Sequence, residues 1–593
     1  MAEQGLEHLS PQALAALQGI DGHHGDVQFV DHQPATGHGH QGPFAPKAHA
    51  RSALFSQLAV PLRLVPEATE AALVQVLAGL EVVGLQGEAG QLLELFTCHS
   101  KLPAAFLPFI VSPDALPAAM VISSELDQGG AGVLDGAAPS AQRLFEPHRD
   151  ASSPNRNLAP ITAELDADGR LQVGGCGLSS LARTYGTPLY VLDEASLRAT
   201  CRAYREALAA HYPGEALALY ASKANSSLAI SALVASEGLG LDAVSSGELL
   251  TALDGGMPAD RIVFHGNNKS RQELALAVER GVTVVADNWR DLELLAELAP
   301  GLAAPVELML RFTPGIECHT HEYIRTGHLD SKFGFDPDQL EPVLRHLVGC
   351  SWARLTGLHA HIGSQIFELQ PHRDLAGVLA DAVALARSMG HPVGDLNVGG
   401  GLGIRYVASD DPPSIQEWVQ TVGEAVATAC QQRGLALPRL LCEPGRSLVA
   451  TAGVTVYEVG SRKEIPGIRT YLSVDGGMSD NPRPITYQSQ YTALLADRPI
   501  AEATETVTLA GKHCESGDVL LKDVALPPAT SGDHLVVLAT GAYNASMSSN
   551  YNRIPRPAAV LVQGGVADLV QRREQPEDLL RYDVLPSRLT TVS

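Results

Sequence analysis

Between residues 217 and 442 the sequence repeats one pattern eight times, a short apolar run followed by an amphipathic stretch with helical spacing. The helical spacing is clearest at 194–209 and 271–280. Such alternation is typical of βα units and a parallel sheet. Eight units in about 250 residues favour a (β/α)8 TIM barrel over the competing doubly wound open sheet. The predicted strands are 217–222, 239–244, 262–265, 282–286, 306–312, 355–361, 395–398 and 440–442.

Polar residues or glycines follow nearly every one of these predicted strands. In a TIM barrel the active site is built at the carboxyl ends of the strands. A single histidine or lysine in such a place is more often a packing or surface residue, but packing alone does not produce a near-complete ring. The strand-end residues are Lys223, 245–248, 265–268, Arg311, 359–364, 399–401 and 443–446.

The loops after the last strands have the composition of an anion site. Gly399, Gly400 and Gly401 follow the seventh strand, and glycines let backbone N–H groups approach an anion closely. Three glycines by themselves are usually only a turn. Here Arg446 follows the eighth strand, where barrels commonly bind phosphate, and Ser364 follows the sixth. We therefore expect a phosphate cradle.

Lys223 ends the first predicted strand, where an unpaired buried ammonium would be costly. A surface lysine is the alternative. A Schiff base with an aldehyde cofactor removes the charge and supplies chemistry. Glu443, on the opposite wall, could keep a pyridine nitrogen protonated, and His361 could stack on the ring. These residues predict pyridoxal 5'-phosphate (PLP) as the cofactor.

Composition narrows the class of protein. A net charge of -24 and a pI near 5.3 argue against nucleic acid or an anionic membrane as partners. The eight cysteines are scattered without a CxxC pair, so we expect neither disulfides nor a zinc site. No apolar run is long enough to span a bilayer, and no secretory signal is recognisable. We expect a cytoplasmic enzyme.

The first 150 residues differ in composition from the rest of the chain. They contain no Tyr or Trp, and they hold nine of the 21 histidines. Imidazole binds metals, but the histidine spacing matches no recognised site, so we expect no metal. Residues 53–97 could form a small helical unit, and 124–158 has the composition of a linker. We treat 1–155 as an unassigned N-terminal extension, partly disordered or the result of a start codon placed too far upstream.

Beyond residue 453 short alternating runs predict an all-β sandwich or barrel, to which 171–173 is expected to add a strand. The predicted domains after the extension are an N-terminal segment at 156–190 that contributes to the β domain, the PLP-binding barrel at 191–452 and the β domain at 453–593.

Eight motifs between residues 158 and 562 resemble one known family. The chain is similar to the diaminopimelate decarboxylases, fold-type III PLP enzymes related to alanine racemase and to ornithine and arginine decarboxylases. One departure is RPITY, where many members resemble RPALY. The motifs are YGTPLYVLDE (185–194), YASKAN (220–225), HAHIGSQ (359–365), NVGGGLGI (397–404), EPGRS (443–447), DNPRPITY (480–487), CESGDVL (514–520) and TGAYNASMSSNYNRIPRP (540–557).

The resemblance implies a role for each matching position. Catalytic roles fall to the cofactor lysine, the ring-stacking histidine, the carboxylate on the pyridine nitrogen and a cysteine that protonates the product carbon: Lys223, His361, Glu443 and Cys514. The expected cofactor-binding set adds Asp242, Ser364, Gly399, Gly400, Gly401, Gly445, Arg446 and Tyr543. The expected substrate-binding set is Arg446, Arg483, Tyr487, Glu515 and Tyr543.

Arg483 and Glu515 indicate a substrate with two amino-acid heads, because they offer counter-ions for a distal carboxylate and ammonium. The resemblance thus implies decarboxylation of meso-2,6-diaminopimelate to L-lysine and CO2, the last step of lysine biosynthesis. It also implies a homodimer with shared active sites, in which Lys332 of one subunit pairs with Asp518 of the other.

Three alternatives remain open. A polyamine-pathway decarboxylase for ornithine, arginine or carboxynorspermidine is disfavoured by Arg483 and the CES tripeptide. A racemase of this fold would carry a tyrosine base where this chain has the CES loop. A non-catalytic PLP-binding homologue would lack the C-terminal β domain or the catalytic residues.

Overall fold

The computed structural model describes residues 150–316 and 330–589, all within one compact unit, Gly136–Ser593. The histidine-rich tract and the helical stretch expected at 53–97 lie outside the described residues. The structure therefore bears on the barrel, on the β domain and on the segment leading into them.

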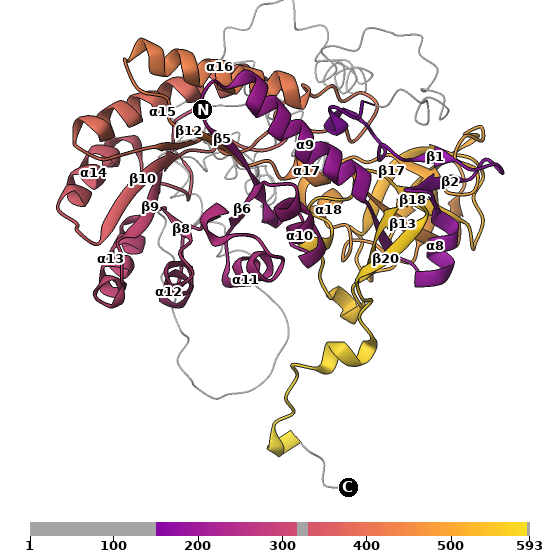
Figure 1. Cartoon of the computed structure of the whole chain (residues 1–593). Helices are drawn as coiled ribbons and strands as arrows, with labels where there is room; N and C mark the ends of the chain where they lie inside the picture. The colour runs from indigo at the N-terminus through magenta and orange to yellow at the C-terminus, as the bar shows by residue number, and fades with distance from the viewer. Residues whose placement is uncertain (1–149, 317–329, 590–593) are drawn as a thin grey trace, which may run out of the picture. The chain divides into compact units, whose positions relative to one another are not determined.

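Eight parallel strands form a closed barrel, in which each strand pairs with the next and the last pairs with the first (Figure 1). All eight strands predicted from the sequence are confirmed, with ends that differ by at most two residues. The strands are β5 (Ala216–Ala221), β6 (Gly240–Ala243), β7 (Ile262–Phe264), β8 (Thr283–Ala286), β9 (Val306–Arg311), β10 (Ala353–His359), β11 (Asp395–Asn397) and β12 (Arg439–Cys442).

Alternation along the strands separates the inside of the barrel from its outer layer. Val285 and Met309 belong to a small apolar cluster inside the barrel, whereas their neighbours Val284 and Leu308 belong to the large cluster that packs against the helices. Both helices predicted from the sequence, at 194–209 and 271–280, are confirmed. The helices around the barrel are α9 (Glu194–His211), α10 (Leu228–Ser236), α11 (Ser246–Asp254), α12 (Arg271–Glu279), α13 (Trp289–Leu298), α14 (Leu340–Val348), α15 (Gln370–Ser388) and α16 (Ile415–Gln432).

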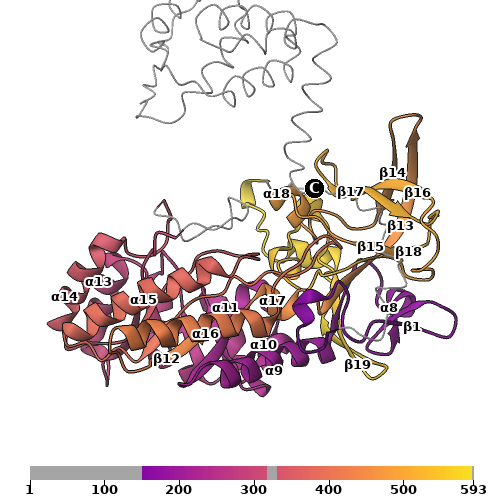
Figure 2. The ribbon, with the colours of Figure 1, turned by 90° about the horizontal axis from the view of Figure 1, so that it is seen from above.

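The second domain is a nine-stranded sheet organised around β13 (Gly453–Ile465). One end of β13 pairs with β4 and β18, and its other end pairs with β14. Figures 1 and 2 both show β13 and β18 grouped away from α13 and α14. The remaining strands are β4 (Leu189–Asp193), β14 (Arg469–Val474), β15 (Ala493–Leu495), β16 (Glu505–Ala510), β17 (Val519–Leu526), β18 (His534–Val537), β19 (Ala558–Gln563) and β20 (Val566–Gln571).

Short helices connect the two domains or border them. They are α8 (Leu178–Tyr185), α17 (Arg446–Val449), α18 (Arg483–Tyr487) and the 3-10 turns η2 (Pro154–Arg156) and η3 (Ser222–Ala224). Among the residues that the structure describes, no helix is both long and apolar enough to cross a membrane.

Two sequence-based expectations need correction. Leu171–Val173 forms β2, the middle strand of a separate three-stranded sheet with β1 (Glu164–Leu165) and β3 (Cys176–Gly177). The part of the chain before the barrel instead contributes β4 to the C-terminal sheet, and all five residues of β4 are buried.

The described end of the supposed linker is also ordered against the barrel. Ser153 and Asn155 are buried, and Asn155 donates hydrogen bonds to the backbone oxygens of Gly403 and Pro413. Residues 150–158 therefore do not behave as a linker, because buried side-chain hydrogen bonds hold them to the barrel.

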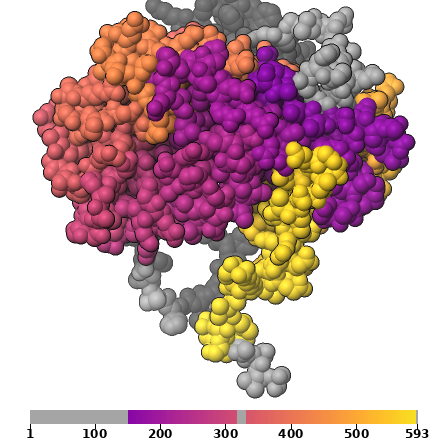
Figure 3. Space-filling view, in the orientation of Figure 1, coloured from indigo at the N-terminus to yellow at the C-terminus, as the bar shows by residue number. Residues whose placement is uncertain are grey.

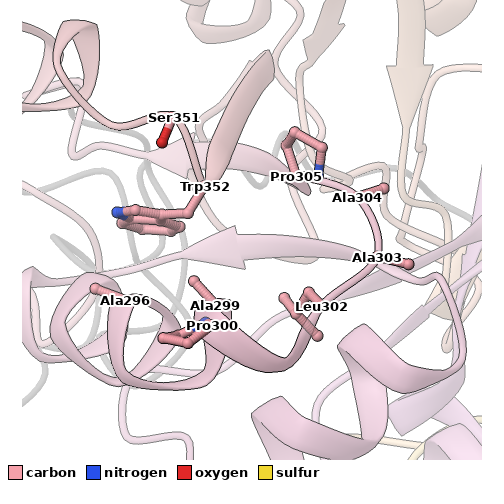
Figure 4. A pocket seen from close by; sticks show the side chains of 9 residues that line it. All are labelled: Ala296, Ala299, Pro300, Leu302, Ala303, Ala304, Pro305, Ser351 and Trp352. Carbon is pink, nitrogen blue, oxygen red and sulfur yellow. The ribbon is translucent and has the colours of Figure 1, made fainter.

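A pocket of about 440 Å³ lies at the amino ends of β9 and β10 (Figure 4). In it Trp352 faces Ala296, Ala299 and Pro300. Because Lys223 follows the carboxyl end of β5, this pocket belongs to the opposite end of the barrel from the candidate site.

Candidate functional site

Lys223 lies in η3, directly after β5, and its Nζ is 3.1 Å from Oδ2 of Asp242 on β6. Asp242 is buried, and its other oxygen has no hydrogen-bond partner among the described residues. Burial alone lowers the pKa of Lys223, but the charges of Asp242, Tyr543 and Glu443 outweigh burial and raise it. About half of the Lys223 side chain is exposed, so the amine can be approached from solvent.

Glu443 follows β12 and is surrounded by nitrogen atoms in the buried centre of the barrel mouth. Asn397 Nδ2 donates to Oε1 at 2.7 Å. His265 Nε2 lies 2.8 Å from Oε1, and His359 Nε2 lies 3.2 Å from Oε2. Burial raises the pKa of Glu443, but the two histidines outweigh it and lower the pKa well below its usual range. Glu443 is therefore ionised and able to attract a proton on a ligand.

His361 and the glycines after β11 are in close contact. Gly400 N donates to His361 Nδ1 at 3.3 Å. A Cβ on Gly399 would lie 2.6 Å from His361 Nδ1, and one on Gly400 would lie 2.2 Å from the backbone oxygen of Glu443. Glycine is therefore required here by close packing. Desolvation, aided by the positive charges of Arg311 and Lys223, lowers the pKa of His361, which keeps its ring neutral.

Arg446 is buried at the start of α17. Its Nη2 donates to Ser364 Oγ at 3.0 Å, and its Nη1 donates to the hydroxyl of Tyr406 at 2.7 Å. Gly445 precedes it, and a Cβ there would lie 3.0 Å from Cβ of Ala221 at the end of β5. The predicted phosphate-binding residues Arg446 and Ser364 are thus in contact, although 82 residues separate them in the sequence.

Tyr543 lies between two arginines. The Cζ atoms of Arg446 and Arg483 are 4.9 and 5.5 Å from the centre of its ring. Its backbone N–H donates to the oxygen of Ala224 at 2.7 Å, which brings it beside Lys223. Tyr543 has a φ of 61°, a left-handed conformation that is uncommon for tyrosine and often found at functional sites.

Arg483, at the start of α18, lies against two further tyrosine rings, with its Cζ 5.2 Å from Tyr487 and 5.8 Å from Tyr406. It is buried, and its Nε has no hydrogen-bond partner in the described part of the chain. A buried guanidinium in this state is suited to pair with a carboxylate ligand.

Cys514 and Glu515 lie elsewhere, exposed at a loop between β16 and β17. Cys514 N donates to Asn552 Oδ1 at 2.9 Å, and the hydroxyl of Tyr551 lies 3.4 Å from Glu515 Oε2. Their recorded hydrogen bonds thus go to the β domain rather than to Lys223 or its neighbours. Within one chain, the structure does not bring Cys514 and Glu515 together with the other predicted site residues.

The expected contact of Asp518 with Lys332 of another subunit stays a prediction, and within one chain Asp518 has other partners. The Asp518 side chain is only 2% exposed, and His513 Nδ1 lies 2.7 Å from its Oδ2. The backbone N–H groups of His513 and Met478 also donate to this carboxylate. Within one chain, three N–H groups or ring nitrogens therefore contact this buried carboxylate.

Four contact residues were not singled out from the sequence: His265, His359, Asn397 and Tyr406. A signal was present for three of them, because His359 and Asn397 end barrel strands, His265 directly follows one, and all three belong to the strand-end residues or the quoted motifs. Their roles depend on contacts across the barrel mouth, which no local pattern encodes.

The assembled groups suit one kind of ligand. The lysine amine suits an aldehyde, and the ionised carboxylate beside two histidines suits a basic ring nitrogen. The serine–arginine pair next to the close-packed glycines suits a phosphate. PLP carries all three groups. The residues present therefore fit the predicted cofactor.

Comparison with known proteins agrees. Residues 194–450 match the pyridoxal binding domain of the pyridoxal-dependent decarboxylases. Diaminopimelate decarboxylase from Synechocystis sp. is 58% identical over 445 residues, which cover 74% of this chain and 95% of that enzyme. The Bacillus subtilis enzyme of the same name is 46% identical over 434 residues, covering 71% and 97%.

A crystal structure of diaminopimelate decarboxylase from M. jannaschii, in complex with L-lysine, is similar with a TM-score of 0.67 and 33% identity. The match covers 72% of this chain and 99% of that chain. The barrel and the β domain are confirmed by the structure, and PLP as the cofactor is supported by the matching family. Given these similarities and the groups at the strand ends, the chain belongs to the diaminopimelate decarboxylase family of PLP-dependent enzymes.

Proposed function

We propose that this enzyme decarboxylates meso-2,6-diaminopimelate at its D-configured carbon and releases L-lysine and CO2. The observation that carries the proposal is Arg483, a buried guanidinium with an unpaired Nε beside Tyr543. No carboxylate of the described residues forms an ion pair with it. A substrate with a carboxylate at its far end would supply the missing partner, and a substrate without one would leave the charge unpaired.

The barrel residues divide the work of holding the cofactor. Lys223 would hold it through its amine, Glu443 would keep a proton on the ring nitrogen, and Arg446 with Ser364 would bind the phosphate. The neutral ring of His361 would stack on the flat ring of the cofactor. When bound, PLP supplies the electron sink that makes loss of CO2 feasible. The protein supplies orientation and fixed charges.

The substrate's far end is held by a separate group of residues. Arg483 binds the distal carboxylate, with Tyr487 and Tyr543 on its flanks, and Glu515 binds the distal ammonium. Cys514 then delivers a proton from its thiol to the carbon that has lost CO2. A charged group at each end of the distal head distinguishes this substrate from ornithine or arginine.

Because Cys514 and Glu515 are exposed in the single chain, we also propose a homodimer in which they complete the partner's site. Exposed apolar side chains nearby support this proposal. Arg553 binds the backbone of Leu579 and the side chain of Asp583 in the C-terminal segment. That segment leads away from the β domain (yellow in Figure 3), and in it Tyr582 is 84% exposed. Apolar surface of this kind is typical of a protein interface.

A cytoplasmic location belongs to the same proposal. It rests on the scattered cysteines, of which the six in the described residues are all free.

The test is product analysis with the purified enzyme and PLP. Release of CO2 and L-lysine is expected from meso-diaminopimelate, with little turnover of the L,L isomer. Ornithine, arginine and carboxynorspermidine form the comparison panel. Turnover of one of these in preference to meso-diaminopimelate would overturn the proposal in favour of a polyamine-pathway decarboxylase.

A further inference from the structure

The loop that carries Cys514 and Glu515 is exposed at its tip and buried at its base. Residues 514–517 are exposed, whereas the side chains of His513 and Asp518 on either side are 0% and 2% exposed. A reactive tip on a loop is mobile unless its ends are held. His513 and Asp518 are therefore placed to hold the two ends of the loop.

The Asp518 carboxylate ties both ends of the loop together. Its Oδ2 accepts the backbone N–H of His513 at 2.9 Å and lies 2.7 Å from the same residue's Nδ1. Its Oδ1 accepts the N–H of Met478 at 2.7 Å, which joins the loop to the chain after β14. Three contacts to one buried carboxylate, one of them to an imidazole, form a rigid base.

Two glycines leave room for this carboxylate. A Cβ on Gly511 would lie 2.1 Å from Asp518 Oδ2, and a Cβ on Gly477 would lie 2.5 Å from both carboxylate oxygens. Neither distance is possible for real atoms, so a side chain at either position would displace the carboxylate. The backbone is thus shaped around the His513–Asp518 pair.

A second segment connects the pair to the exposed tip. The ring of Tyr551 is stacked on His513, with centroids 6.0 Å apart and planes inclined by 19°. The hydroxyl of the same tyrosine reaches Glu515, and the next residue, Asn552, accepts the backbone N–H of Cys514. The Glu515 side chain and the Cys514 backbone are therefore connected to His513 through Tyr551 and Asn552.

We propose that His513 and Asp518 are positioning residues that set where Cys514 and Glu515 are presented to the substrate. The inference rests on the proposed function, in which those two residues act on diaminopimelate. Neither member of the pair touches the substrate. The pair acts by holding the loop in one conformation, and misplacement of a reacting group by about 1 Å can lower a rate by about 100-fold.

The test uses full-length holoenzyme and two substitutions of one residue. His513→Leu removes the Nδ1 contact to Asp518, whereas His513→Asn keeps an N–H at nearly the same place. We expect His513→Leu to raise KM for meso-diaminopimelate, through Glu515, and to lower kcat, through Cys514. The combined loss in kcat/KM should be about 10- to 100-fold, and His513→Asn should recover most of it.

The matched control is His391→Asn, a buried histidine whose Nε2 lies 2.9 Å from the backbone oxygen of Leu344 near the far end of α15. It should leave kcat and KM unchanged. Cofactor absorbance should be the same in all variants, because PLP is held by barrel residues. If His513→Leu fails to fold, Tyr551→Leu removes the stacking from an exposed side and should shift kcat and KM in the same direction.

A second readout does not depend on activity. The rate of Cys514 alkylation by iodoacetamide, followed by mass spectrometry of its peptide, should change several-fold in His513→Leu and little in His513→Asn. If the wild-type enzyme turns over meso-diaminopimelate and His513→Leu has wild-type kcat, KM and labelling rate, the positioning role is overturned. If the wild-type enzyme does not turn over this substrate, the proposed function fails, and the labelling rates alone decide the positioning role.

Discussion

Nζ of Lys223 lies 3.1 Å from Oδ2 of Asp242, and this ion pair joins the carboxyl ends of the neighbouring strands β5 and β6 at the barrel mouth. The amine is held charged in this pair, yet half of its side chain remains accessible. An amine in this position can be approached by an aldehyde without unfolding of the loop. This geometry supports Lys223 as the residue that carries the cofactor.

Replacement of Lys223 by alanine should abolish the visible absorbance of protein-bound cofactor and all release of CO2. The physical reason is that no other described lysine follows a barrel strand beside Glu443. Absorbance spectra and CO2 release, measured with added PLP, provide the check. Lys463→Ala, at an exposed position of β13, is the control and should behave as wild type. Decarboxylation at near wild-type rate by Lys223→Ala would refute the assignment.

Tyr406→Phe should weaken cofactor binding while leaving the fold intact. The hydroxyl of Tyr406 accepts a hydrogen bond from Nη1 of the buried Arg446 at 2.7 Å. Its loss leaves a buried guanidinium N–H without a partner, which costs about 1.5–3 kcal/mol. We expect the Kd for PLP to rise about 10- to 100-fold.

Cofactor titration followed by absorbance measures this Kd. Tyr212→Phe is the matched control. The hydroxyl of Tyr212 donates to the backbone oxygen of Pro438, which precedes the amino end of β12, whereas Glu443 follows its carboxyl end. An unchanged Kd for Tyr406→Phe would mean that Arg446 does not bind the phosphate through this arrangement.

The barrel could be predicted from the sequence because each of its strands is recognisable from a few consecutive residues. Each strand is a short apolar run with polar residues or glycine at its carboxyl end, and Lys223 and Glu443 belong to this set of strand-end residues. Even the boundaries agree, as in β9, predicted at 306–312 and observed at Val306–Arg311.

Long-range contacts could not be predicted in the same way. The histidine–asparagine surroundings of Glu443 join four strand ends, and the buried pair of Asp518 with His513 joins the two ends of one loop. The choice of β4 rather than β2 for the C-terminal sheet was missed for a related reason. Both runs are apolar, and only pairing with β13 and β19 distinguishes them.

Arg483→Met should lower kcat/KM for meso-diaminopimelate about 100-fold or more, mainly through KM. The substitution removes the charge that the distal carboxylate needs but keeps a side chain of similar length. Affinity for PLP should change little, because Arg483 Nη2 donates to Ser489 Oγ, which is not among the predicted cofactor-binding residues. Steady-state kinetics and PLP titration on the same preparation separate the two effects. A large loss of PLP affinity with unchanged KM would instead place Arg483 at the cofactor.

His372→Leu should flatten the dependence of stability on acidic pH. His372 is buried on α15 beside Gly401 and Trp418, and burial lowers its pKa to about 4. Neither of its ring nitrogens has a hydrogen-bond partner within the described chain. The unfolded histidine, whose pKa is 6.5, takes up a proton that the folded one refuses. Stability from this group is therefore complete above pH 6.5 and is lost as the pH falls toward 4.

At pH 5 the loss amounts to on the order of 2 kcal/mol of unfolding free energy. Leucine at position 372 has no proton to take up, so the Tm of the variant should fall less than that of the wild type between pH 7.5 and pH 5. Thermal unfolding followed by circular dichroism at both pH values gives the comparison. His211→Leu, at the end of α9, is the control, and should follow the wild-type pH dependence. Parallel Tm curves for wild type and His372→Leu would show that His372 is already protonated in the folded enzyme, since only a neutral buried ring produces the predicted difference.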